Sequence, residues 1–303
     1  MTIAVTSRSF AKNEYLRKKL TEIDPNAKFN DTDSTLKGDN LVSFLKDCDT
    51  AITSMEIIDE ALISKLPSLK KISKFGVGID MIDKKALEKR GIDLKYFPGT
   101  NKRSVSELVI SLSTLLLRKA PIMNSDMKEG KWKQIKGRQL SGSTVGIIGC
   151  GPIGRDVIHL LEPYRSRLLV FDQVNLRDIC TKYKDVHQTS LEDLLRQSDV
   201  ISLHLPLNNE TKNIINLDMI KLIKKNAVII NLARGGLIDE VELIQSLKKG
   251  NIGGAAIDCF KDEPLIDYEI SKIPNLFTTP HIGGSTEEAI LAMGIAAIEG
   301  VKI

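Results

Sequence analysis

The segment VGIIGCGPIG at residues 145–154 decides the fold more than any other part of the chain. Apolar residues at 144–148 lead directly into its glycines, as in a buried strand, and apolar residues at helical spacing begin at Val157. A GxGxxG spacing alone is a weak signal. Between a strand and a helix, the same spacing indicates a dinucleotide-binding loop.

Each glycine of this loop has a separate physical task. Gly149 allows a tight turn, Gly151 lets the backbone approach a pyrophosphate, and Gly154 permits close packing of helix on strand. Pro152 and Ile153 lie between them, at the start of the helix, whose N–H groups face the phosphates. We therefore expect all five residues to bind a dinucleotide cofactor.

An acidic residue ends the next apolar run. Residues 168–172 are predicted to form a strand that closes with Asp172. A carboxylate at this place binds the adenosine ribose hydroxyls and repels a 2′-phosphate, which favours NAD over NADP.

Alternating strands and helices extend on both sides of the loop. In residues 1–97 we expect strands at 3–6, 50–53, 71–75 and 92–96, and helices at 11–20, 57–65 and 84–89. The second series has strands at 144–148, 168–172, 200–205, 228–232, 255–259 and 277–279, apolar in nearly every position. Such runs predict α/β architecture with doubly wound parallel sheets. A long apolar helix at 105–119 is either core or a dimer face.

Three polar segments follow predicted strands of the second series. They contain Arg234, Glu263 and His281. Because the carboxyl ends of parallel strands share one edge of a sheet, we expect the three side chains to meet. An arginine fork suits a carboxylate, and a histidine oriented by a glutamate can exchange a proton. This set fits reversible reduction of a 2-keto acid.

Composition limits the classes of protein. Charged residues make up 27% and the net charge is only +4, without a basic block, so we expect no nucleic-acid partner. The chain has no apolar run of membrane-spanning length and no signal-peptide pattern, which predicts a cytoplasmic protein without a membrane partner. Four cysteines at Cys48, Cys150, Cys180 and Cys259 form no metal-binding spacing, so we expect no metal site.

The chain resembles the D-isomer-specific 2-hydroxyacid dehydrogenases over nearly its whole length. The resemblance is carried by FGVGID (75–80), NKRSVSEL (101–108), VGIIGCGPIG (145–154), HLPL (204–207), NLARGGLIDE (231–240), GGAAIDCFKDEPL (253–265) and PHIGGST (280–286). It implies a Rossmann NAD-binding domain, residues 98–284, inserted into a flavodoxin-like substrate domain of residues 1–97 and 285–303.

The resemblance also implies roles for individual residues. Arg234, Glu263 and His281 would be catalytic, with Arg234 and His281 touching substrate. Lys74, Gly76, Val77 and Gly78 would bind substrate as well. Further NAD contacts would come from Ser104, Pro206, Thr211, Ala233, Asp258 and Gly283. The region 101–119 would form a homodimer.

The substrate is left open between two groups. NKRSVSELV and GLIDEVEL resemble phosphoglycerate dehydrogenase, which is the first expectation and would indicate serine biosynthesis. However, Thr53 stands where that subgroup commonly has arginine, and Lys74 where it commonly has a second one. KFGVGID also resembles hydroxypyruvate and glyoxylate reductases. The alternative is therefore such a reductase or a general D-2-hydroxyacid dehydrogenase.

Two rival classes remain. A non-catalytic NAD-sensing corepressor keeps the same motifs, and a formate-dehydrogenase-like enzyme would have Gln in place of Glu263. The sequence stops at Ile303, soon after the expected returning helix at 287–299, so we expect no regulatory domain.

Overall fold

The computed structural model describes residues 2–32, 34–265 and 268–303, which separate into two compact units. The first unit comprises Met1–Asn101 and Gly284–Ile303, and the second comprises Lys102–Gly283. The second unit is therefore an insertion in the sequence of the first. The sequence prediction placed the limits of this insertion at residues 98 and 284.

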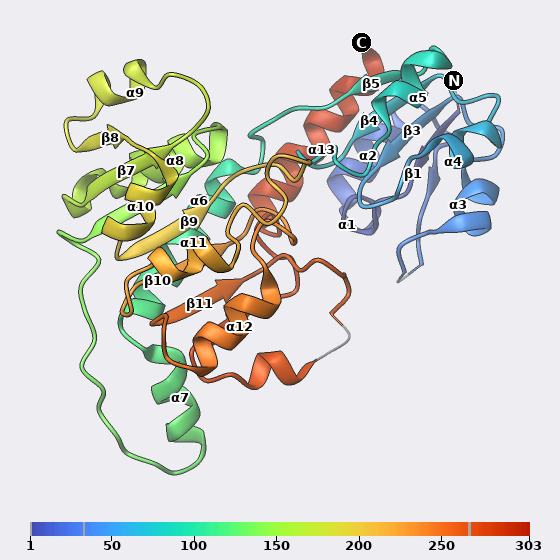
Figure 1. Ribbon diagram of the computed structural model, residues 1–303. Coiled ribbons are helices and arrows are strands. Elements are labelled where there is room, and N and C mark those ends of the chain that lie inside the picture. The colour runs from blue at the N-terminus through green and yellow to red at the C-terminus, as the bar shows by residue number, and fades with distance from the viewer. Residues whose placement is uncertain (1, 33, 266–267) are drawn as a thin grey trace. The chain divides into compact units, whose positions relative to one another are not determined.

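The first unit is a parallel five-stranded sheet with helices around it (Figure 1). The strand order is β2-β1-β3-β4-β5, which is the flavodoxin-like order. The strands are β1 (Ile3–Val5), β2 (Lys28–Phe29), β3 (Thr50–Thr53), β4 (Lys71–Lys74) and β5 (Asp93–Lys95). The helices are α1 (Arg8–Ala11), α2 (Glu14–Thr21), α3 (Gly38–Leu45), α4 (Glu60–Ser64), α5 (Lys84–Lys89) and α13 (Glu287–Lys302).

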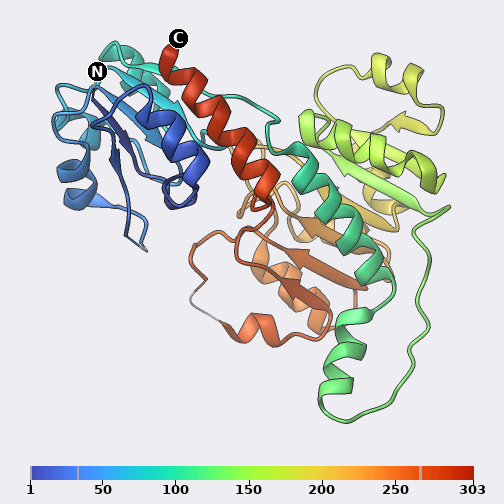
Figure 2. The same ribbon diagram turned by 180° about the vertical axis from the view of Figure 1, so that it is seen from behind.

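Helix α13 returns the chain to the first unit and completes its core. Thr286 caps the helix by accepting a hydrogen bond from the Ala289 N–H at 3.1 Å. The helix lies against β4 and α2, as Figure 2 shows. Gly294 permits this contact, because a Cβ there would stand 2.2 Å from a methyl carbon of Leu16.

The second unit is a parallel seven-stranded sheet with the order β12-β11-β10-β9-β6-β7-β8. Its strands are β6 (Thr144–Ile148), β7 (Arg167–Phe171), β8 (Val186–Gln188), β9 (Val200–Leu203), β10 (Val228–Asn231), β11 (Gly254–Ile257) and β12 (Leu276–Thr278). Its helices are α6 (Lys102–Leu117), α7 (Ala120–Lys128), α8 (Pro152–Leu161), α9 (Arg177–Lys182), α10 (Leu191–Gln197), α11 (Leu217–Leu222) and α12 (Glu240–Lys248), with 3-10 turns at Glu162–Tyr164 and Tyr268–Lys272. The order reverses at β6, as in dinucleotide-binding folds. Both predicted fold classes are therefore confirmed.

Two apolar layers enclose this sheet because alternate strand residues point to opposite faces. Ile147 belongs to the buried apolar cluster that contains residues of α6 and α8, whereas Ile148 belongs to the cluster that contains residues of α10, α11 and α12. The predicted helix at 105–119 is α6, and its apolar residues, such as Val109 and Leu112, are buried in this core. A homodimer through this region stays a prediction.

Several predicted elements were wrong in detail. The edge strands β2 and β8 were not expected, so the sheets have five and seven strands rather than four and six. The helix expected at 11–20 begins only at Glu14, where Asn13 caps α2, and the short helix α1 before it, capped by Ser7, was not expected. The predicted strands at 200–205, 228–232 and 255–259 end before their last residues, and those residues form loops instead.

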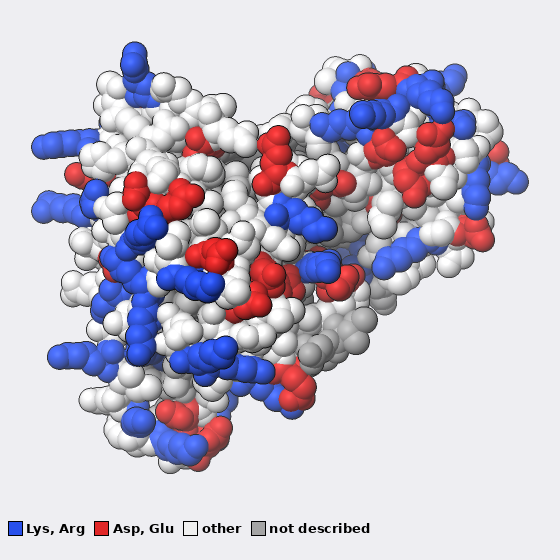
Figure 3. Space-filling model, in the orientation of Figure 1, with Lys and Arg blue, Asp and Glu red and all other residues white. Residues whose placement is uncertain are grey.

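The surface carries both signs of charge. Lys, Arg, Asp and Glu are interspersed on the face of each unit seen in Figure 3. Among the described helices, none combines the length and apolarity of a membrane span.

Candidate active site

The glycine loop joins β6 to α8 at the point where the strand order reverses. Gly149 has a φ of +96°, and a Cβ there would lie 2.7 Å from the His204 carbonyl oxygen. At Gly154 a Cβ would lie 2.2 Å from the Gly149 carbonyl oxygen. Both positions therefore require glycine for packing.

Gly151 differs because the space that a Cβ would occupy is open. A Cβ there would meet no atom of the described residues within 4 Å. Gly151 is the N-cap of α8, and Pro152 occupies its first turn, followed by Ile153. Among the described residues, no side chain caps this helix, so its first N–H groups are available to a phosphate. These residues fit the pyrophosphate of a dinucleotide.

Asp172 lies directly after β7 and braces the same loop. One carboxylate oxygen accepts a hydrogen bond from the Cys150 N–H at 2.7 Å, and the other accepts one from the Val174 N–H at 3.1 Å. The carboxylate is therefore fixed beside the glycine loop, where the adenosine ribose of a dinucleotide lies in this fold.

Three neighbouring strands end level with one another at the edge that carries the polar segments. Asn231 of β10 pairs with Ile257 of β11, which pairs with Thr278 of β12. The backbone ladder continues past these ends, since the Asp258 N–H donates to the Asn231 carbonyl at 3.0 Å and the His281 N–H donates to the Asp258 carbonyl at 2.9 Å. The three loops therefore form one connected platform.

The loop of Arg234 is clamped from both sides. The Asn231 side chain donates to the Arg234 carbonyl at 2.7 Å and accepts from the Ala233 N–H at 3.1 Å. The Arg234 guanidinium donates to the Ala233 carbonyl at 2.6 Å. Gly235 then packs on the Phe260 backbone, which begins the loop of Glu263. Sequence reasoning gave Asn231 no role, although an amide directly at a strand end is a typical clamp.

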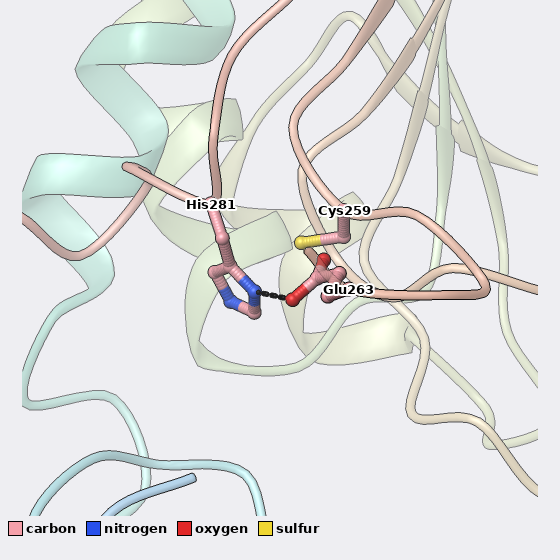
Figure 4. Close-up of side chains that lie close together, drawn as sticks. All are labelled: Cys259, Glu263 and His281. Carbon is pink, nitrogen blue, oxygen red and sulfur yellow. Dashed lines mark hydrogen bonds and ion pairs between the residues drawn. The ribbon is translucent and has the colours of Figure 1, made fainter. Parts of the chain in front are cut away.

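Glu263 and His281 form a hydrogen-bonded pair (Figure 4). The Glu263 Oε2 atom lies 2.8 Å from the His281 Nδ1 atom, and both side chains are partly exposed. The other carboxylate oxygen of Glu263 accepts from the Phe260 N–H at 2.9 Å. Burial opposes ionisation of Glu263, but the hydrogen bond and charge of His281, the Phe260 N–H and the charge of Arg234 outweigh it and lower the pKa of Glu263.

Asp258 holds the loop that presents His281. It is fully buried, and its carboxylate accepts from the Thr279 hydroxyl at 2.6 Å, the Ile282 N–H at 2.7 Å and the Gly283 N–H at 2.8 Å. His281 itself has a φ of +55°, which a residue with a side chain rarely adopts. These bonds keep His281 in that conformation.

Two predicted cofactor residues secure neighbouring loops. Ser104 is buried and donates from its hydroxyl to the Gly283 carbonyl at 2.6 Å. Thr211 donates from its hydroxyl to the Pro206 carbonyl at 2.6 Å and so closes the loop after β9. Contacts of Ser104, Pro206, Thr211, Ala233, Asp258 and Gly283 with a cofactor stay predictions.

The predicted substrate residues lie in the first unit. Lys74 ends β4, is buried, and donates its ammonium to the Ser54 carbonyl. Gly76 has a φ of +116°, and a Cβ there would lie 3.8 Å from the Lys74 Nζ atom. The substrate roles of Lys74, Gly76, Val77 and Gly78 stay predictions.

Comparison with known proteins shows the class. Residues 110–283 match the model of the D-isomer specific 2-hydroxyacid dehydrogenase, NAD binding domain. The chain therefore belongs to the D-isomer-specific 2-hydroxyacid dehydrogenase family, and its second unit is the NAD-binding domain of that family.

Individual relatives carry several names. The chain is 36% identical over 270 residues to a D-3-phosphoglycerate dehydrogenase of Methanocaldococcus jannaschii, covering 88% of this chain and 52% of the relative. It is 33% identical over 297 residues to a hydroxypyruvate reductase of Thermotoga maritima, covering 95% of each. The structure of a D-lactate dehydrogenase from Aquifex aeolicus, complexed with NAD and lactic acid, superposes with a TM-score of 0.87 at 27% identity, covering 100% of this chain and 94% of that one. The chain spans about half the length of the phosphoglycerate dehydrogenases it matches.

Proposed function

We propose that this chain interconverts a D-2-hydroxy acid and its 2-keto acid with NAD as the hydride carrier. The observation that supports this most strongly is the hydrogen bond of 2.8 Å between Glu263 and His281 on the same strand-end platform as Arg234. A proton-exchanging imidazole and a carboxylate-binding guanidinium are the groups that a 2-keto acid requires.

Each side chain has a task in the reduction. Bound NADH supplies the hydride that reaches the keto carbon. Because the His281 Nδ1 atom faces Glu263, its Nε2 atom is the nitrogen left to give a proton to the carbonyl oxygen. Glu263 stabilises the charged ring, and the Arg234 fork holds the substrate carboxylate. In the oxidative direction His281 accepts the proton again.

We propose NAD rather than NADP as the cofactor, on the strength of Asp172. Its carboxylate is held by two backbone N–H groups beside the glycine loop. A 2′-phosphate there would meet this negative charge at close range, whereas ribose hydroxyls would donate to it.

We propose D-3-phosphoglycerate as the first candidate substrate. Relatives named D-3-phosphoglycerate dehydrogenase and the motifs at 101–109 and 236–243 support it. One observation favours the small keto acids hydroxypyruvate and glyoxylate as the alternative. The Lys74 ammonium is buried and bonded to the Ser54 carbonyl, and Thr53 carries no charge to help bind a phosphate.

The experiment measures NAD reduction with D-3-phosphoglycerate beside NADH oxidation with hydroxypyruvate and with glyoxylate. Turnover restricted to the phosphorylated acid supports a phosphoglycerate dehydrogenase. For such an enzyme we further propose a role in serine biosynthesis, a cytoplasmic location and a homodimer. Turnover restricted to the small acids supports the reductase alternative. Tight NADH binding without turnover on any of them would contradict the proposal and favour an NAD-sensing protein.

A further inference from the structure

Cys259 lies beside the Glu263–His281 pair, although the spacing of these residues in the sequence gave no sign of it. Cys259 comes two residues after the end of β11, and its thiol faces the pair (Figure 4). One ligand atom each from Cys259, Glu263 and His281 lie within 4.8 Å of one another. The thiol is buried, whereas the other two side chains are about one-third exposed, at 27% and 32%. The cluster is therefore closed to solvent at the thiol and open to solvent at the carboxylate and the imidazole.

We propose that this cluster binds a soft divalent cation, Zn²⁺, as an inhibitory site. A thiolate, an imidazole and a carboxylate are the side chains that coordinate zinc, and three protein ligands leave a fourth position for water. Bonds of about 2.0–2.3 Å in a tetrahedron separate ligand atoms by roughly 3.3–3.7 Å. The Glu263 and His281 atoms, now 2.8 Å apart, would open slightly, and the thiol would move inward from its present place.

Charge makes Cys259 decisive for this site. The positive charge of Arg234 acts on Glu263 and would repel a cation bound there. Glu263 and His281 alone would therefore hold a cation weakly. A thiolate from Cys259 adds a second negative charge and the soft ligand that zinc prefers over harder cations. The proposal thus rests on a residue that has no part in the proposed reaction.

Occupation of the cluster would stop turnover, and this consequence rests on the proposed function. A metal bound at the His281 Nδ1 atom replaces the Glu263 hydrogen bond that orients the ring. The ring is then held as a neutral imidazole with its proton on Nε2, which is a far weaker acid than the imidazolium that Glu263 stabilises, so it no longer gives a proton to the carbonyl oxygen. A chelator would restore activity by removing the metal.

The experiment titrates the purified full chain with Co²⁺, a spectroscopic substitute for zinc, and follows the absorption of the thiolate–Co²⁺ bond. In parallel, Zn²⁺ is added to the NADH-dependent assay and then removed with EDTA. We expect the thiolate band at one metal per chain, and inhibition that EDTA reverses.

The matched variants are Cys259→Ser and Cys180→Ser, the second removing a thiol from α9 in the same unit. In Cys259→Ser the thiolate–Co²⁺ band should vanish. The zinc concentration for half inhibition should rise more than about tenfold, since even the loss of a group that only hydrogen-bonds to a ligand lowers metal affinity by that factor. Cys180→Ser should behave as the wild type, and Cys259→Ala serves if the serine variant folds poorly.

Two results would overturn the proposal: no thiolate band in the wild-type chain, or equal zinc sensitivity in the wild type and Cys259→Ser. The Co²⁺ titration needs no turnover. A chain that binds Co²⁺ through its thiol but reduces no keto acid therefore refutes the proposed function and leaves the metal site standing.

Discussion

Gly235 lies so close to Phe260 that a Cβ on residue 235 would stand 1.9 Å from the Phe260 carbonyl carbon. This contact joins the loop of Arg234 to the loop of Glu263. A methyl group there must push the two loops apart. The glycine therefore sets the spacing of the proposed carboxylate-binding and proton-exchanging groups.

The first prediction concerns this spacing. Gly235→Ala should lower the free energy of unfolding by about 1–3 kcal/mol through overpacking. It should also lower kcat/KM for the keto acid on the order of a hundredfold, because a displacement of about 1 Å costs that much. Thermal unfolding and steady-state kinetics measure the two effects.

Gly151→Ala is the control for this prediction. In the part of the chain that the structure describes, no atom lies within 4 Å of the new Cβ, so the Tm should equal that of the wild type. NADH binding should nevertheless weaken, because the methyl group occupies the open side where a pyrophosphate would approach. An unchanged Tm in Gly235→Ala would show that the loops adjust without cost.

The second prediction concerns Arg234. Arg234→Lys keeps the charge but loses the planar fork. The KM for the keto acid should rise roughly 10- to 150-fold, as expected for the loss of one charge-assisted hydrogen bond worth about 1.5–3 kcal/mol. The KM for NADH should not change. An unaltered keto-acid KM would remove Arg234 from the carboxylate site.

The third prediction concerns cofactor choice. Asp172→Asn keeps an acceptor for the Cys150 N–H while removing the negative charge. The preference for NAD over NADP, measured as a ratio of kcat/KM values, should fall at least about tenfold, since a like-charge contact costs more than about 1.4 kcal/mol. If the ratio stays at the wild-type value, the carboxylate does not face the 2′ position.

The fourth prediction concerns acid stability. Burial lowers the pKa of His204 from 6.5 to about 4, and its Nε2 atom has no hydrogen-bond partner among the described residues. As the pH falls, the unfolded chain takes up this proton at a higher pH than the folded chain does. The contribution of neutral His204 to the free energy of unfolding is therefore fully present above pH 6.5 and is lost as the pH falls to about 4. The loss attributable to His204 should reach about 3 kcal/mol.

Denaturation of wild type and His204→Gln across this pH range measures the difference. The slope of unfolding free energy against pH should flatten in the variant. His159 is the matched control because it is exposed on α8. Parallel slopes for the wild type and His204→Gln would show that the ring is not held neutral.

Much of the architecture follows from local patterns. Buried strands such as β6 and β9 are mostly apolar runs, so their presence and parallel direction could be predicted. The edge strands β2 and β8 could not be predicted in this way. β2 has only two residues, and β8 buries only Val186, so neither shows an apolar run. Their pairing comes from the neighbouring strand.

For the candidate site, too, the positions of residues along the sheet could be predicted, but not all of the side-chain neighbours. Arg234, Glu263 and His281 could be placed on one edge because each follows a parallel strand. The closeness of Cys259 to the pair could not be predicted. It depends on the left-handed conformation of His281 and on the backbone N–H groups of Ile282 and Gly283, which donate to Asp258 and hold the loop, and no spacing rule contains these features.

The most direct test of the account is the turnover of His281→Ala measured beside its NADH affinity. We expect kcat to fall about 10²- to 10⁴-fold, the usual contribution of a general acid, and the Kd for NADH to stay unchanged. Turnover within a few fold of wild type, at intact NADH binding, would show that His281 does not give the proton and would contradict the central claim.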